Sequence, residues 1–320
     1  MTEHFDVICI GAALVDIVAQ VERHPVEDDE VFVSNLTLFS GGAAANTACA
    51  CAKLGSSTAF LGKMGLEDSF GSKIIQDFKE SRVSTELIKY SKDRMTGCAY
   101  IILNREGDRR IYAYSGAANY LSKKDIIEKE LIQTKVIFLS SLKNLAPFIK
   151  AAKIGRQYKI PVILNPGMLI IEQGFENIIK LLENVDILIL SQREFITLMK
   201  IKKNQFNSKE IEMQIKNLTN LGIKAIVITK GARGASLFTP FNSKLIPAPT
   251  VEDVIDTTGA GDAFSAGFIY GFLKSLKYDF NNLIYSIRIG NYVAGKCIQK
   301  LGARNGIPNF NELKEAIANF

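Results

Sequence analysis

The sequence predicts an α/β fold built on a mostly parallel sheet. Between residues 136 and 229, short apolar runs alternate with amphipathic helical runs, which is the pattern of parallel strands joined by crossover helices. The chain has 320 residues, of which 47% are hydrophobic and 22% charged, so it can bury a sizeable core. No internal repeat or low-complexity segment interrupts the pattern. We therefore expect residues 1–320 to form a single domain.

Charge, hydropathy and cysteine usage exclude several classes of function. The formal charge of +6 comes from 39 basic and 33 acidic side chains scattered along the chain, without the basic stripe that nucleic-acid binding predicts. No apolar run reaches 18 residues, so a membrane span is not expected. The five cysteines stand in apolar or small-residue runs, typical of buried, reduced thiols, and a structural zinc site is not expected. We expect a soluble protein of the cytoplasm.

In the N-terminal third of the chain, the sequence predicts mainly strands. A buried apolar run predicts the first strand, an alternating run the second, and the turn at Pro25 separates it from a third. Gly41 and Gly42 precede a helix of small residues, and Asp68 or Ser69 is the expected N-cap of an amphipathic helix. The predicted elements are strands 5–12, 14–21, 31–39, 57–64 and 85–90, helices 43–54 and 68–82, and a hairpin of 97–103 with 109–115.

The rest of the chain alternates strand and helix. The predicted elements are strands 136–141, 161–165, 186–190, 224–229 and 235–239, an extended run 244–251, and helices 145–158, 175–184, 192–200, 208–221 and 282–299. A further helix, opened by residues 256–264 and running to about Lys274, carries Ala263, Gly267 and Gly271 at intervals of four. This small-residue face is expected to press closely on the sheet.

Residues 256–264, with the sequence DTTGAGDAF, carry the chemistry. Gly259 and Gly261 let backbone N–H groups turn toward one point at a helix N-terminus, where the helix dipole adds positive charge and favours an anion. Asp262 would repel a resting anion. The conflict resolves if the anion is a phosphoryl group in transfer and Asp262 removes a proton from the attacking hydroxyl. A kinase has this requirement.

This run resembles the signature of the ribokinase-like (PfkB-type) family of sugar and nucleoside kinases. A second family signature, Gly41-Gly42-Ala43-Ala44-Ala45-Asn46, lies near the N-terminus, and the order of elements between them also fits. The resemblance implies a three-layer α/β/α sandwich with a small β-sheet lid formed by about 14–39 and 96–115. It also implies ATP as phosphoryl donor and Mg²⁺ as cofactor.

The same resemblance implies roles for the residues of the reaction centre. Asp262 matches the general base, and Gly259, Ala260 and Gly261 match the backbone groups that stabilise the developing charge. The positions that hold the sugar hydroxyls match Asp16, Gly42 and Asn46. From the residues alone, Asn46 is also consistent with a solvent-facing or capping amide.

Nucleotide and ion sites follow by resemblance too. Thr229, Gly231, Gly234 and Asn291 match nucleotide-binding positions. Glu194 matches the acid that organises Mg²⁺ through water, although Ser191 replaces the usual Asn.

A loop cluster matches the monovalent-cation site of many relatives. It comprises Asp256, Thr258 and Gly302. Gly306 and Lys300 differ there from the Ser and Arg that ribokinases often carry, so K⁺ activation is left open.

Fewer residues bear on the choice of substrate than on the reaction type. Ala43 stands where ribokinases typically carry Lys, which favours a nucleoside, with adenosine as the type. The alternatives are a ribokinase or another hexose or keto-sugar kinase, and, in another class, a catalytically idle binding protein that senses a sugar or nucleotide. The glycine fingerprint of a nicotinamide-dependent oxidoreductase would need a further glycine at position 264, where this chain has Phe264. Arg109 and Arg110 are either phosphate-binding lid groups or exposed turn residues, and a homodimer through the lid is allowed.

Overall fold

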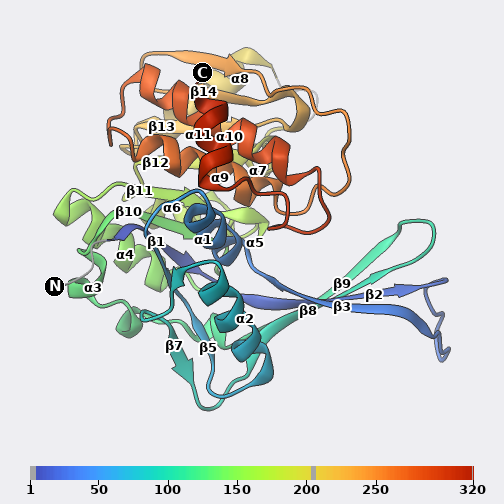
Figure 1. Cartoon of the computed structure of the whole chain (residues 1–320). Coiled ribbons are helices and arrows are strands. Elements are labelled where there is room, and N and C mark those ends of the chain that lie inside the picture. The colour runs from blue at the N-terminus through green and yellow to red at the C-terminus, as the bar shows by residue number, and fades with distance from the viewer. Residues whose placement is uncertain (1–4, 203–206, 319) are drawn as a thin grey trace.

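The computed structural model describes residues 5–202, 207–318 and 320, and Figure 1 shows a layered body from which a second sheet projects. The strands of the central sheet are β1 (Phe5–Gly11), β4 (Thr58–Leu61), β6 (Val83–Ser84), β10 (Thr134–Ser140), β11 (Val162–Asn165), β12 (Ile187–Ser191), β13 (Ala225–Thr229), β14 (Ala235–Phe238) and β15 (Ser243–Ile246). Their spatial order is β15-β14-β13-β12-β11-β10-β1-β4-β6. All neighbours pair in parallel except β13 with β14 and β14 with β15. The predicted α/β fold with a mostly parallel sheet is confirmed.

Helices cover both faces of this sheet, so it separates two hydrophobic cores. One face carries α1 (Ala43–Lys53), α2 (Ser69–Glu80), α9 (Ala260–Phe272), α10 (Phe280–Cys297) and α11 (Phe310–Ile317). The other carries α4 (Ala146–Tyr158), α5 (Gly167–Ile171), α6 (Phe175–Leu182), α7 (Gln192–Leu198) and α8 (Ser208–Thr219). Successive strand residues alternate between the cores: Val7 and Cys9 pack in the first, Ile8 and Ile10 in the second. Burial on both faces explains why the strands are continuous apolar runs.

A smaller sheet contains the segments predicted as a lid. Its strands are β2 (Leu14–Val21), β3 (Val33–Gly41), β8 (Thr96–Leu103) and β9 (Arg109–Gly116), in the order β3-β2-β8-β9. β2 and β8 are parallel, and the two outer pairs are antiparallel. Figure 1 shows this sheet extending from the side of the main body.

Several sequence-based predictions of elements were wrong. The run 57–64 is two strands in different sheets, because β4 ends before Gly62 and β5 (Lys63–Gly65) pairs with β7 (Lys89–Ser91). A Cβ at Gly62 would lie 2.6 Å from the Gly11 carbonyl oxygen, so a glycine is required where the chain leaves β4. Of the predicted strand 85–90, only residues 89 and 90 belong to a strand, β7, while residues 85–88 form a turn with a buried Leu87 whose burial explains the apolar pattern. Of the extended run 244–251, only residues 244–246 form a strand beside β14, as part of β15 (Ser243–Ile246).

Several short elements were not predicted. They are β6, α3 (Glu128–Leu131), α5, α11 and the 3₁₀ turns η1 (Ala117–Tyr120), η2 (Lys123–Asp125) and η4 (Gly231–Arg233). The other predicted helices begin and end within two residues of the observed bounds. Across the described residues, every helix is too short or too polar to cross a membrane.

The small-residue face of α9 contacts a helix, which corrects the expectation of a sheet contact. A Cβ at Gly267 would lie 2.8 Å from the Ile289 carbonyl oxygen, and one at Gly271 would lie 2.7 Å from the Ser286 Cα. Both neighbours belong to α10. These glycines therefore let α9 and α10 approach closely, and this contact anchors the helix that begins at the predicted reaction centre.

Candidate active site

The N-terminus of α9 has the geometry expected of an anion site. Gly259 is the N-cap residue, with φ of 77°, and a Cβ there would lie 2.4 Å from the Cβ of Ala303. Only glycine fits both conditions. The Ala260 N–H donates a 3.3 Å hydrogen bond to the Thr257 carbonyl, whereas the N–H groups of Gly261 and Asp262 have no partner within the described part of the chain. These two donors are available to a ligand.

Asp262 lies in the first turn of α9 and is partly buried. The Asn46 amide, from α1, donates a 2.9 Å hydrogen bond to its Oδ2. Burial raises the pKa of Asp262 to about 7, although the Asn46 hydrogen bond and the charge of Arg304 act to lower it. Burial likewise raises the pKa of Asp16, on β2, to about 6, against the charge of Arg304. The charge of Asp16 is one of the causes that raise the pKa of Asp262, so the predicted base and one predicted substrate residue form one electrostatic unit.

A cavity of about 420 Å³ lies between the smaller sheet and two loops, one that precedes α9 and one that follows α10. Its walls include Asp16 and Arg109 from the smaller sheet, and Asp256, Thr258 and Arg304 from the loops. The volume lies within the usual range for small-molecule sites. Its sheet wall also carries the apolar side chains Val18, Phe39, Ile101 and Leu103.

The loop predicted as a cation site is held by its own hydrogen bonds. Asp256 accepts from the Thr258 N–H at 2.9 Å and from the Gly302 N–H at 2.8 Å. Burial alone would raise the pKa of Asp256, but the bonds from Thr258 and Gly302 and the charge of Arg109 hold it below the ordinary value. A Cβ at Gly306 would lie 2.3 Å from the Cys297 carbonyl oxygen, which explains the absence of a serine there.

The predicted Mg²⁺ acid takes part in a helix cap. Glu194 Oε2 accepts from the Ser191 N–H at 2.7 Å, and the Ser191 hydroxyl accepts from the Glu194 N–H at 3.2 Å, which is a capping box at the start of α7. Glu194 also lies near enough to Asp262 for its charge to raise the pKa of that carboxyl. The backbone N–H of residue 191 therefore fixes the direction of the glutamate, while the hydroxyl of the serine that replaces the expected asparagine caps the helix.

The predicted nucleotide residues lie at the ends of neighbouring strands. Thr229 ends β13 beside Ser191 of β12, and Gly231 and Gly234 form the turn that follows, with φ of 59° and 86°. Asn291 is buried in α10, and its amide donates to the carbonyls of Ile246 and Pro247 at 3.2 and 3.1 Å. In this structure the Asn291 side chain holds the chain that leaves β15.

Sequence reasoning missed Arg304. This residue is partly buried, lines the cavity, and donates from Nε to Asn46 Oδ1 at 2.9 Å. Its position two residues after Gly302, in the loop predicted as a cation site, was the only signal in the sequence.

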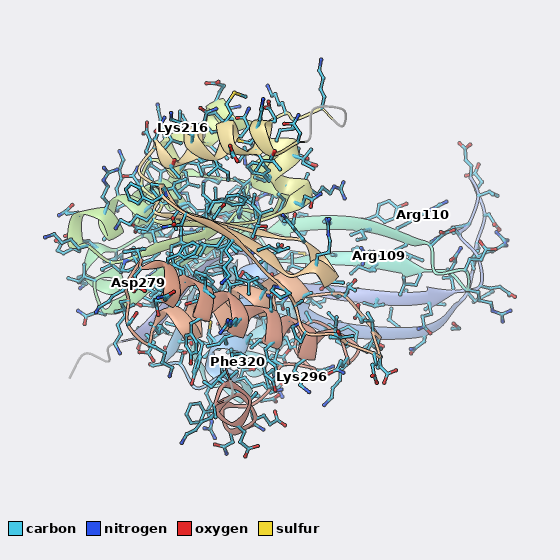
Figure 2. The ribbon with its side chains drawn as sticks, turned by 90° about the horizontal axis from the view of Figure 1, so that it is seen from above. Arg109, Arg110, Lys216, Asp279, Lys296 and Phe320 are labelled. Carbon is cyan, nitrogen blue, oxygen red and sulfur yellow. The ribbon has the colours of Figure 1, made fainter. Side chains whose placement is uncertain are left out.

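The two arginines of the hairpin differ in their surroundings. Arg109 pairs with Leu103 and lines the cavity, whereas Arg110 is the next residue and points to the opposite face of the strand. Figure 2 shows both on the projecting sheet.

The comparison with known proteins decides the family. The model of the family described as "pfkB family carbohydrate kinase" matches residues 4–309 of this chain. The chain belongs to the pfkB family of carbohydrate kinases. It is 31% identical over 312 residues to a ribokinase of Staphylococcus aureus (strain COL), covering 97% of this chain and 98% of that protein.

Solved structures show the same fold. The structure of Arabidopsis thaliana ribokinase complexed with ribose and ATP matches with a TM-score of 0.86 and 24% identity, covering 99% of both chains. The nucleoside kinase of Methanocaldococcus jannaschii matches with a TM-score of 0.81 and 22% identity, covering 99% of this chain and 100% of that one. As a pfkB-family member the protein is an ATP-using phosphotransferase with an alcohol group as acceptor, acting on a sugar or nucleoside.

Proposed function

We propose that this kinase transfers the γ-phosphoryl group of ATP to a primary hydroxyl of a nucleoside's ribose. The observation that carries the proposal is the position of Asp262, in the first turn of α9 beside the free N–H donors and bonded to Asn46. A carboxylate whose pKa is about 7 can accept a proton at neutral pH. The adjoining N–H groups stabilise the negative charge that develops on the transferred group.

In this mechanism the chain's own groups bind, orient and deprotonate the acceptor. Asp16 and Asn46 hold the sugar hydroxyls, with Gly42 allowing close approach of the backbone. Asp262 accepts the proton of the attacking hydroxyl, while the backbone of residues 259–261 contacts the phosphoryl oxygens. The smaller sheet acts as a lid that excludes water, so that ATP is not hydrolysed instead.

The site has groups suited to the nucleotide and a metal. Gly261 has open space where a Cβ would be, which leaves room for phosphate against the helix N-terminus. Thr229, Gly231, Gly234 and Asn291 would line the nucleotide. Glu194 has one carboxylate oxygen outside its cap and would hold Mg²⁺ through water, since Mg²⁺ prefers oxygen ligands and keeps several waters. When bound, Mg²⁺ neutralises charge on the phosphates.

The loop around Asp256 is the proposed site of a monovalent cation. Thr258 and Gly302 belong to the same loop cluster, and both donate backbone N–H groups to the Asp256 carboxylate. K⁺ dependence of turnover, compared with Na⁺ at equal ionic strength, tests this part of the proposal.

A nucleoside is favoured by the walls of the cavity. The apolar side chains Val18, Phe39 and Leu103 can cover a nucleobase, whereas a free pentose presents hydroxyls on all sides. A second candidate function, ribokinase or another hexose or keto-sugar kinase, is favoured by the likeness to the Staphylococcus ribokinase.

A homodimer through the lid is also proposed. Alternation along the strands puts Leu36, Tyr100 and Tyr112 on the face opposite the cavity, and these side chains are 47–63% exposed. A contiguous apolar face of this kind marks an interaction surface. Light scattering on the wild type and on a Leu36→Glu/Tyr112→Glu variant tests it: a dimer that dissociates supports the proposal, and a monomeric wild type overturns it.

The kinase assay measures ADP release from Mg²⁺-ATP with adenosine, inosine, cytidine, ribose, fructose and 2-keto-3-deoxygluconate as acceptors. Turnover of a nucleoside by the wild type but not by Asp262→Asn supports the leading proposal. Turnover of a sugar alone selects the second candidate. Binding without turnover of any acceptor would overturn the assignment of Asp262 as base.

A further inference from the structure

We propose that Arg304 is a positioning residue that fixes the orientation of the Asn46 amide and thereby keeps Asp262 as an acceptor for the substrate's proton. The proposal rests on the proposed role of Asp262 as base. It assigns to Asn46 a task besides contact with the sugar, and it gives a function to an arginine that no sequence signature marked.

Two hydrogen bonds connect three distant segments into one chain of groups. Arg304 Nε donates to Asn46 Oδ1 at 2.9 Å, and Asn46 Nδ2 donates to Asp262 Oδ2 at 2.9 Å. Asn46 itself is buried, with 7% of its surface exposed, because α1 packs against α9. The Thr47 hydroxyl, next along α1, lies 3.4 Å from the Asp262 carbonyl oxygen and ties the same two helices together. The amide therefore has little freedom to move between its two partners.

The donors and acceptors permit one arrangement. A guanidinium group can only donate, so the end of the amide that faces Arg304 must be the oxygen. The NH₂ end then faces Asp262, and it can only donate. Asp262 must in turn present an oxygen that accepts, and the carboxylate, being charged, accepts this bond more strongly than the carbonyl oxygen of the protonated acid does. Arg304 thus favours the basic form of Asp262 through the amide, without touching it.

The charges around Asp262 show why such a device is needed. Burial raises the pKa of this carboxyl, and the charges of Asp16 from β2 and Glu194 from α7 raise it further. The Asn46 hydrogen bond and the Arg304 charge are the two influences that lower it. Burial, and then the charge of Asp262, raise the pKa of the Cys297 thiol of α10. Without Arg304, the acid would be protonated over more of the neutral range, and it could not act as a base there.

Arg304 is not placed where stability alone would favour it. Its Nη2 atom is buried and has no hydrogen-bond partner among the described residues. A buried polar group without a partner is unfavourable, so the position calls for another explanation. Tuning of the base supplies one.

The test compares Arg304→Gln with Arg304→Lys, and uses Arg82→Gln as the matched control. Arg82 is exposed and shares with Arg304 only the walls of a neighbouring cavity behind α1. Arg304→Gln should shift the acidic limb of the pH profile of kcat/KM to higher pH by about one pH unit. At pH values below the limb kcat/KM should then fall about tenfold, and at pH values above it far less. Arg304→Lys keeps the charge and should move the limb less. Arg82→Gln should leave the limb in place. A limb that keeps its position in Arg304→Gln, with activity lowered equally at every pH, would overturn the proposal.

A second measurement does not depend on turnover. Carbon-13 NMR of the Asp262 carboxyl, assigned with Asp262→Asn, follows its titration in the unliganded protein. A higher pKa in Arg304→Gln than in the wild type supports the proposal even if no acceptor in the panel is phosphorylated, and an unchanged pKa overturns it. In a double-mutant cycle of this titration, Asn46→Ala should remove the part of the Arg304→Gln effect that passes through the amide and leave the part due to the arginine's charge, so the two pKa changes should sum to more than the double variant shows. Full additivity of the two pKa changes would contradict that route.

Discussion

The side-chain amide of Asn165 donates a 3.0 Å hydrogen bond to the hydroxyl of Ser265, which donates at 2.9 Å to the Gly261 carbonyl. Asn165 is the last residue of β11, and Ser265 is fully buried one turn into α9. The carboxyl end of a central strand is thus connected to the turn of backbone that carries the free N–H donors. The orientation of the N-terminus of α9 is therefore fixed by this contact with the sheet as well as by its own capping.

Removing this connection should affect both stability and catalysis. Ser265→Ala leaves the Asn165 amide without its partner in a partly buried site, so we expect a loss of about 1–3 kcal/mol in the free energy of unfolding. We also expect a lower kcat, because the first turn of α9 is less fixed. Ser286→Ala is the control, since Ser286 is equally buried but bonds only to Asn282 within its own helix. Urea unfolding of both variants checks this, and equal losses would show that the link to the strand adds nothing.

Asp262→Asn should separate activity from stability. Turnover should fall by about 10²–10⁴-fold, because the amide cannot accept the proton. The folded-state pKa of about 7 lies above the ordinary value, so the wild type loses stability as pH rises from about 4 through 7. Asn has no such titration. The variant should therefore be more stable than the wild type at pH 8, by about 1–2 kcal/mol given the partial exposure, and should match it near pH 4. Thermal unfolding across this range measures the difference, and a constant difference would contradict the raised pKa.

The two glycines of the signature should respond differently to the same substitution. Gly259→Ala forces a Cβ to within 2.4 Å of Ala303 at a positive φ, so we expect a protein that unfolds more easily by about 1–3 kcal/mol. Gly261→Ala meets nothing within 4 Å and replaces a helical glycine, so stability should stay equal or rise by about 0.5–1 kcal/mol. Its turnover should still fall, because the new methyl group occupies space proposed for phosphate. A fully active Gly261→Ala enzyme would argue against phosphate at this helix end.

The capping box at the start of α7 offers a test of the proposed Mg²⁺ acid. Glu194→Gln can keep the bond from the Ser191 N–H but loses the charge, so stability should hold while the Mg²⁺ concentration needed for half-maximal activity rises about 10- to 100-fold. Ser191→Ala keeps the carboxylate and loses a cap, which should lower the free energy of unfolding by about 1 kcal/mol. Activity titrated with Mg²⁺ and thermal unfolding distinguish the two, and an unchanged Mg²⁺ requirement in Glu194→Gln would remove Glu194 from the metal site.

Much of the fold could be predicted because burial on both faces leaves a mark on the sequence. The apolar runs of β10, β12 and β13 are explained by the two cores, and a break such as Gly62 is missed because one glycine does not interrupt such a run. Periodicity along α9 identified a close-packing face but could not say what packs there, since small residues suit a helix as well as a sheet.

The candidate site could be predicted only where local chemistry marks it. Gly259 and Asp262 lie in the same short run of sequence, and the conflict between an anion site and a carboxylate is enough to indicate phosphoryl transfer. The link from Arg304 to Asn46 joins residues 258 positions apart and follows no period, so only the folded chain reveals it. The capping role of Ser191 is hidden for a different reason, because it depends on the glutamate three positions later and not on the difference between serine and asparagine at this position.

The two cores separated by the central sheet draw on different parts of the chain. The core beneath α4, α6 and α7 uses buried residues from Phe5 to Ile228, whereas the core on the site face also needs α9, α10 and α11. During synthesis the core beneath α4, α6 and α7 can form while the opposite face of the same strands still lacks the helices that will cover it. A growing chain would expose an apolar sheet surface until the last helices emerge, and in that interval it is most exposed to aggregation and most dependent on chaperones.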